Sequence, residues 1–61
     1  MGFHKSDFTG KTRAEIQQML DAKFRAGKID QKQFDKASKI LMKLNSGDLL
    51  TDKQVKDLVG L

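Results

Sequence analysis

The stretch Gly-Lys-Ile-Asp-Gln-Lys-Gln-Phe, residues 27–34, decides the fold of this 61-residue chain. Gly27 can readily take the left-handed backbone conformation that is found just after a helix. Asp30 and Gln33 then form a capping box, in which each side chain accepts a hydrogen bond from the backbone amide of the other residue. An apolar residue flanks the box on either side, as in a hydrophobic staple. The stretch therefore predicts a short turn that joins two antiparallel helices.

Apolar residues recur at helical spacing on both sides of this turn. After the turn, a helix is predicted over residues 31–45. Its apolar stripe consists of Phe34, Ala37, Ile40, Leu41 and Leu44. Before the turn, a helix is predicted over residues 13–26, and it begins at a second capping box formed by Thr12 and Glu15. We expect the two helices to pack through their apolar stripes as a hairpin.

A third capping box, Thr51 with Gln54, predicts a short helix over residues 52–59. A helix of this length is not stable alone in water, so it must pack on the hairpin. The apolar residues that we expect to make this contact are Val55, Leu58 and Val59.

The predicted fold class is all-α, with an antiparallel helical hairpin plus a short third helix in a single domain over residues 12–61. Residues 1–11 are expected to form a loosely ordered segment, because Phe3 and Phe8 are its only apolar anchors besides Met1. This segment could cap the core or contact a partner. A chain this short buries only about 60% of the surface that its unfolded form exposes. A core of this size is marginal, which favours close helix packing together with association.

Few residues of this sequence could carry chemistry. There is no cysteine and a single histidine, His4. Disulfides, thiolate metal sites and histidine metal clusters are therefore excluded. A Ser-His-Asp triad cannot be assembled around one histidine in a loose segment, and no glycine-rich phosphate loop is present. We predict no enzymatic activity, no catalytic residue, no metal, no cofactor and no small-molecule substrate.

The sequence also bears on the compartment. No apolar run approaches the roughly 20 residues that a membrane span requires. The N-terminus lacks the apolar stretch of a secretory signal, and the absence of cysteine fits a reducing compartment. We expect a cytoplasmic protein with no membrane partner.

Residues 16–44, and residues 27–34 above all, resemble the SHOCT (short C-terminal) domain. Members of that family are small helical hairpins with a Gly-x-Ile turn, a capping residue and a Glu-Phe pair. Here Gln33-Phe34 occupies the position of that pair. The glutamine in place of glutamate, and a further helix beyond the hairpin, depart from the family pattern. The resemblance implies an oligomerising or binding accessory module without catalysis.

A group of lysines follows the predicted second helix and the turn before it. These lysines are Lys28, Lys32, Lys36, Lys39 and Lys43. The four on the helix share one narrow stripe, nearly opposite the apolar residues. Such a stripe could bind nucleic-acid phosphates without reading the base sequence. The interpretation that we favour is a solvated face, and a contact with an acidic protein is a third.

The apolar arc of the predicted second helix is wider than one neighbouring helix requires. A helix that is apolar over so much of its circumference usually packs against more than one neighbour. The third helix could be that neighbour, or a second protein could. The predicted protein-interaction surface consists of Phe34, Ile40, Leu41, Met42 and Leu44.

These observations favour a small non-enzymatic helical module that self-associates as a homo-oligomer or docks on a partner protein. One alternative is a sequence-nonspecific DNA- or RNA-binding regulator that uses the lysines. Another is a small phage-type inhibitor of a larger enzyme, which only the size of the chain supports.

Overall fold

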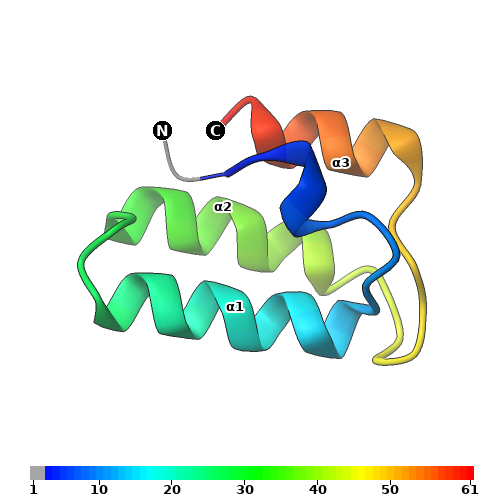
Figure 1. Cartoon of the computed structure of the whole chain (residues 1–61), viewed down its shortest axis with the longest axis horizontal. Helices are drawn as coiled ribbons and strands as arrows, with labels where there is room; N and C mark the ends of the chain where they lie inside the picture. The colour runs from blue at the N-terminus through cyan, green and yellow to red at the C-terminus, as the bar shows by residue number, and fades with distance from the viewer. Residues whose placement is uncertain (1–2) are drawn as a thin grey trace.

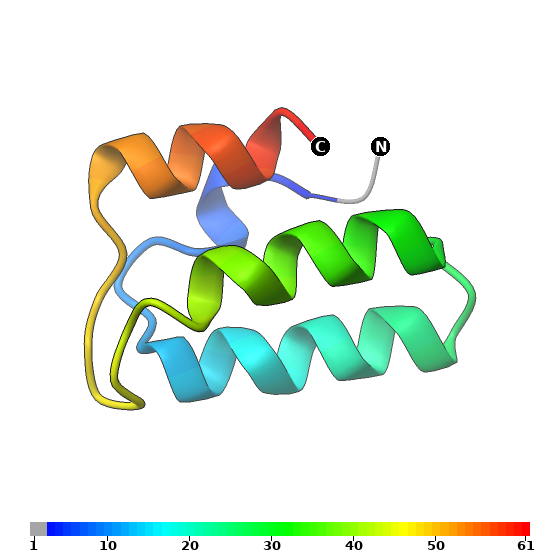
Figure 2. The ribbon, with the colours of Figure 1, turned by 180° about the vertical axis from the view of Figure 1, so that it is seen from behind.

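The structure, a computed structural model, describes residues 3–61. Over this range the chain forms a short 3-10 helix, η1 (Lys5–Asp7), and three α-helices: α1 (Arg13–Arg25), α2 (Gln31–Leu41) and α3 (Asp52–Val59). Figure 1 shows α1 and α2 as antiparallel neighbours, with α3 on the other side of α2. The view from behind shows the same order, and η1 packs next to α3 (Figure 2). The predicted all-α fold of a hairpin plus a short third helix is confirmed.

The turn between α1 and α2 is closed by backbone hydrogen bonds around Gly27. The φ angle of Gly27 is 73°, in the left-handed region expected from the sequence. The Lys28 amide donates to the Lys23 carbonyl (2.9 Å), and the Gly27 amide donates to the Phe24 carbonyl (3.1 Å). Together the two bonds form a Schellman motif, which satisfies carbonyls that the end of α1 leaves without a helical partner.

Replacing Gly27 with alanine is expected to lower the free energy of unfolding by about 1–2 kcal/mol, because a side chain strains the left-handed backbone. A Cβ added at Gly27 meets no atom within 4 Å, so the effect comes from the backbone and not from a clash. Gly47→Ala is the matched control, since Gly47 also faces open space and its φ is not positive. This control should be neutral or slightly stabilising. Urea unfolding measures both variants, and equal losses would contradict this account of the turn.

The side chain of Gln33 links the start of α2 to the end of the described chain. It closes the predicted capping box: the Gln33 amide donates to Asp30 Oδ1 (2.8 Å), and the Asp30 amide donates to Gln33 Oε1 (3.1 Å). Its Nε2 also donates to the main-chain oxygen of Leu61 (3.2 Å). A glutamate could close the box but could not donate the second bond. The amide at this position therefore also holds the segment that follows α3.

Helix α2 ends at Leu41, whereas the sequence predicted an end at residue 45. In a longer helix the Asn45 amide would donate to the Leu41 carbonyl. Instead that amide donates to Asp48 Oδ2 (3.0 Å), and Nε of Arg13 donates to the Leu41 carbonyl (3.2 Å). A local turn and a side chain from α1 thus replace the last helical turn.

The other two predicted capping boxes are also present. The Glu15 amide donates to Thr12 Oγ1 (3.4 Å), and the Gln54 amide donates to Thr51 Oγ1 (3.2 Å). Helix α3 has the predicted bounds, and α1 ends at Arg25, one residue before its predicted end. Local capping signals therefore located the starts of all three α-helices that the structure describes.

The segment between α2 and α3 folds back onto the start of α1. The Arg13 amide donates to the Asp48 carbonyl (2.8 Å), and the Ala14 amide donates to the Ser46 carbonyl (3.1 Å). Amides in the first turn of a helix have no helical acceptor, so these bonds satisfy them. An isolated antiparallel β-bridge to Leu49 extends the contact. The path of the chain into α3 is fixed in this way.

Residues 3–11, which the sequence predicts as a loosely ordered segment that could cap the core or contact a partner, pack on the core of the helices. Phe3 and Phe8 are 6% and 2% exposed, and their ring centroids are 5.7 Å apart. The His4 amide donates to Asp7 Oδ2 (2.9 Å) across η1. Both rings join the core of the helices, and burial of their apolar surface offsets the conformational entropy that the segment loses. Residues 1 and 2 of the expected segment lie outside the described range.

The core lies where the hairpin, α3 and the N-terminal segment meet. Its buried side chains are Phe3, Phe8, Ile16, Leu20, Ile29, Ala37, Leu41, Val55 and Leu58. Half-buried apolar side chains, including Met19 and Leu50, pack around it. Within residues 3–61, no helix combines the length and the apolar character that crossing a membrane requires.

Candidate interaction surfaces

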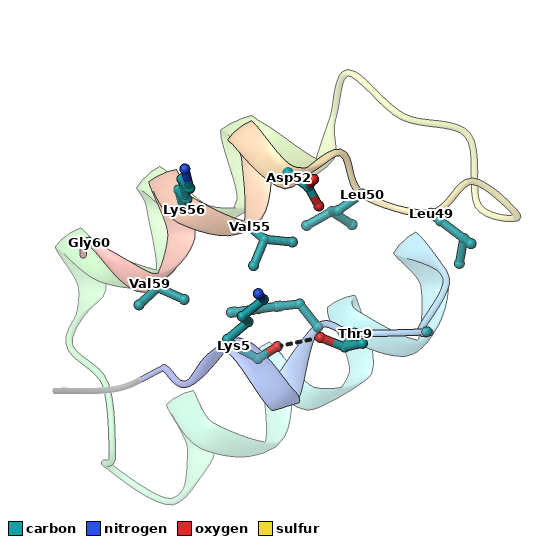
Figure 3. A pocket seen from close by; sticks show the side chains of 11 residues that line it. Lys5, Thr9, Leu49, Leu50, Asp52, Val55, Lys56, Val59 and Gly60 are labelled. Atoms are coloured by element: carbon teal, nitrogen blue, oxygen red, sulfur yellow. Dashed lines mark hydrogen bonds between the residues drawn. The ribbon is translucent and has the colours of Figure 1, made fainter.

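A groove lies between α3 and the turn that follows η1, and its volume is about 820 Å³ (Figure 3). Its apolar lining consists of Phe8, Leu49, Leu50, Val55 and Val59. Its charged lining consists of Lys5, Asp52 and Lys56. We call this feature the α3 groove.

Helix geometry and core packing together build the α3 groove. Val55 and Val59 are one helical turn apart, so both point into it from α3 (Figure 3). Phe8 and Val55 belong to the core, which makes this part of the lining rigid. Leu49 is held at one end by the β-bridge to the start of α1. The two ends of the groove remain open to solvent, since Leu49 is 59% and Val59 is 42% exposed.

The charged residues of the α3 groove come from both of its walls. Lys5 belongs to η1, and its carbonyl accepts a hydrogen bond from Thr9 Oγ1 (3.0 Å). Asp52 and Lys56 belong to α3 and are one turn apart on the same face. The lining therefore combines a central apolar surface with opposite charges, which is an arrangement typical of protein-binding sites.

The structure leaves all five predicted lysines exposed: Lys28, Lys32, Lys36, Lys39 and Lys43. Because α2 ends at Leu41, only the middle three lie on the helix. Lys28 lies in the turn before α2, and Lys43 lies in the turn after it. The lysines are thus spread along the hairpin from the turn before α2 to the turn after it, and Asp35 is exposed on the same helix.

The predicted protein-interaction surface on α2 is largely covered, and this corrects the assignment made from sequence. Leu41 is 0% exposed and belongs to the core, so it cannot contribute to a surface. Ile40 and Leu44 are half-buried and pack against the core. Phe34 is half-buried and stacks on Phe24 of α1 with ring centroids 4.7 Å apart.

Met42 is the exception within that predicted surface, because it is 73% exposed. It follows the last residue of α2 and caps the helix through its backbone amide, which donates to the Ser38 carbonyl (2.9 Å). The wide apolar arc of α2 therefore packs within the fold: α1 and α3 both contact this helix, and its buried residues share one core with Phe3 and Phe8. A single exposed methionine remains, and it does not line the α3 groove.

Two residues of the α3 groove, Val59 and Leu49, have sequence signals that helical periodicity alone does not connect. Val59 was assigned to the contact between the third helix and the hairpin, but only Val55 and Leu58 are buried there. Leu49 precedes the third capping box, where no helical period assigns it to a face. Two adjacent leucines before the box, Leu49 and Leu50, could have indicated one buried and one exposed apolar side chain.

The described residues offer little for chemistry at these surfaces. Among residues 3–61, no group of three His, Cys, Asp or Glu side chains is placed to hold a metal ion. The polar side chains of the α3 groove are two lysines, a threonine and an aspartate. Their arrangement can attract charged groups and orient an apolar ligand surface.

Comparison with known proteins does not place the chain in a family. No protein-family model, curated protein or solved structure matches the chain. The resemblance to the SHOCT family therefore stays a prediction that rests on the residues of the hairpin turn.

Proposed function

We propose that this protein is a small non-enzymatic interaction module that binds a protein surface through the α3 groove. The observation that carries this proposal is the pair of exposed apolar side chains, Leu49 and Val59, at the ends of an apolar groove. Apolar side chains that gather over a concave surface are typical of binding sites. When a partner covers exposed apolar area in a groove, that area leaves water and the free energy of the system falls.

A preformed floor favours binding at the α3 groove. Phe8 and Val55 are 2% and 9% exposed, so their positions are set by the core before any partner arrives. A surface that is already ordered loses little conformational entropy on binding. Full burial of a leucine or valine side chain contributes about 1.5–3 kcal/mol, so partial burial of Leu49 and Val59 supports a weak, reversible contact.

Affinity capture with the tagged chain in an extract of its native cell tests this proposal. The wild type should retain a protein, either this chain or another, after nuclease treatment. Leu49→Lys and Val59→Lys should each reduce retention about tenfold, because an ammonium group resists burial in an apolar groove. Met42→Lys is the matched control. Met42 is exposed but lies outside the groove, so this variant should retain as much protein as the wild type.

Two results would contradict the proposed function. One is the absence of any retained protein, and the other is equal retention by the groove variants and Met42→Lys. Far-ultraviolet circular dichroism of each variant checks that the helices are intact. Leu49 and Val59 lie outside the buried core, so their substitution should preserve the fold.

Sequence-nonspecific nucleic-acid binding is a second candidate function, and one observation favours it. The five lysines along the hairpin are all exposed, so each could neutralise a phosphate. In the capture experiment this function would appear as retention that nuclease abolishes. The double variant Lys36→Gln with Lys39→Gln would then lose retention, and Val59→Lys would not.

We also propose the cytoplasm as the compartment in which the protein acts. The absence of cysteine from the sequence supports a reducing environment. The proposed binding function requires no cofactor, because burial of apolar surface and pairing of charges are sufficient.

A further inference from the structure

Leu49, Asp52, Lys56 and Val59 form a strip along the α3 side of the α3 groove. Figure 3 shows Leu49 and Val59 at opposite ends of this strip, with Asp52 and Lys56 between them. Read from one end to the other, the strip is apolar, negative, positive and apolar. We call it the α3 strip.

The α3 strip is complementary to a second copy of itself that runs in the opposite direction. When a second α3 helix lies antiparallel to the first, Leu49 of each copy meets Val59 of the other. In the same register, Asp52 of each copy meets Lys56 of the other. Each contact then occurs twice about a two-fold axis, as in the isologous interfaces of homodimers.

We propose that the α3 groove binds a second copy of this chain, with the two α3 helices antiparallel across a two-fold axis. This inference rests on the proposed function, since it names the protein that the groove binds. The charge complementarity of Asp52 and Lys56 selects this occupant. An acidic or a basic partner helix would match only one of these two charges.

The charges of α3 also select a single register for the antiparallel pair. A shift of one helical turn in either direction places Lys56 against Lys56 or Asp52 against Asp52, which is repulsive. Lys53 and Asp57 do not interfere, because they line a separate polar hollow toward the end of α2. The α3 strip therefore favours the register in which opposite charges meet.

Two features limit the strength of this dimer. Lys5 on the opposite wall gives each groove two lysines and one aspartate, so the two copies carry an excess of positive charge. A standard interface also takes about 800 Å² from each partner, or about a fifth of the 4238 Å² surface of this chain. One groove offers less than that area, so we expect a reversible dimer that forms as the protein concentration rises.

Sedimentation equilibrium between about 10 µM and about 1 mM tests the dimer. The average mass of the wild type should rise from 6.9 kDa toward twice that value. Asp52→Lys should raise the dissociation constant about tenfold, because both aspartate–lysine contacts become contacts between two lysines. Lys56→Asp should have the same effect, because both contacts then join two carboxylates.

Charge reversal provides the decisive controls. The double variant Asp52→Lys with Lys56→Asp exchanges the two charges of the α3 strip and should dimerise like the wild type. An equimolar mixture of the two single variants should form a heterodimer, because two lysines on one chain meet two carboxylates on the other. The heterodimer is the stricter of these controls, because each single variant keeps its like-charge pair one turn apart within its own α3 helix. If the single variants acted only by weakening the fold, mixing them would restore nothing.

A measurement without substitutions covers the case in which a variant fails to fold. Asp52 lies in the first turn of α3, where its charge favours the helix, so Asp52→Lys lowers stability somewhat. In the wild type, the amide chemical shifts of Leu49, Asp52 and Val59 should change with concentration. Those of Gln18 and Ala22, which are exposed on α1, should not change.

A wild type that stays monomeric at every concentration overturns the second copy as occupant. So does a dimer that the single variants leave intact or that charge reversal does not restore, since it would use another surface. If a strict monomer still captures a protein through Leu49 and Val59, the proposed function stands and another protein fills the groove. If no dimer forms and no protein is captured, both proposals fail.

Discussion

Replacing Phe8 with alanine is expected to leave most of the protein unfolded at room temperature. Truncation of a buried phenylalanine costs about 3–5 kcal/mol. A single core in a chain of this size rarely supplies more than about 3–5 kcal/mol of net stability. Phe8 is 2% exposed and packs beside Phe3, so the loss of unfolding free energy should reach the value expected for a fully buried phenylalanine. Thermal and urea unfolding followed by circular dichroism would measure it.

The matched control for Phe8→Ala is Phe24→Ala. Phe24 is 36% exposed and stacks on Phe34, a contact worth about 0.5–1.5 kcal/mol beyond its buried area. This variant should remain folded, with a clearly smaller loss than Phe8→Ala. Equal losses would mean that residues 3–11 do not complete the core, and the loosely ordered segment expected from sequence would be the better description.

Leu41→Ala is the second substitution with a large expected effect. Leu41 is 0% exposed, so its truncation should cost about 2–5 kcal/mol through lost burial and the cavity left behind. The variant should lose its cooperative unfolding transition or show a much lower urea midpoint. The prediction depends on Leu41 being a core residue, whereas the sequence placed it on an interaction surface.

Met42→Ala is the neighbouring control for Leu41→Ala. Met42 is 73% exposed, and substitutions at such positions usually change stability by less than about 0.5 kcal/mol. Two adjacent residues should therefore differ several-fold in their effect on the urea midpoint. If Leu41→Ala left the urea midpoint nearly unchanged and reduced self-association instead, the interaction surface predicted from sequence would be the better description of Leu41.

Helix starts could be predicted from this sequence because their signals are local. Each capping box joins residues three positions apart, as in Asp30 with Gln33, and the same is true of the other two boxes. Periodicity then assigned Ala37, Val55 and Leu58 to faces that pack within the fold, and all three are buried. No long-range contact was needed for these predictions.

The end of α2 could not be predicted in the same way, because a distant side chain contributes to it together with a local turn. Arg13 donates to the Leu41 carbonyl from a position far earlier in the chain. Periodicity continues through Leu44, so a sequence pattern alone extends the helix too far. The second hydrogen bond of Gln33 could not be predicted either, because its acceptor, the main-chain oxygen of Leu61, is distant in the sequence.

The candidate site was the least predictable part of the molecule. The α3 groove exists only because η1 and the turn after it pack next to α3. The sequence showed apolar residues in both places but gave no reason to bring them together. Burial of Phe3 and Phe8 is what holds the N-terminal segment against α3 and so creates one wall of the groove.

The bonds from Ser46 and Asp48 to the first turn of α1 bear on how this small protein opens locally. Helix ends usually fray and exchange their amide hydrogens with solvent quickly, because those amides lack partners. Here the carbonyls of a distant segment protect the amides of Arg13 and Ala14. We therefore expect the start of α1 to fray together with the segment that leads into α3, in one cooperative opening event that also displaces Leu49.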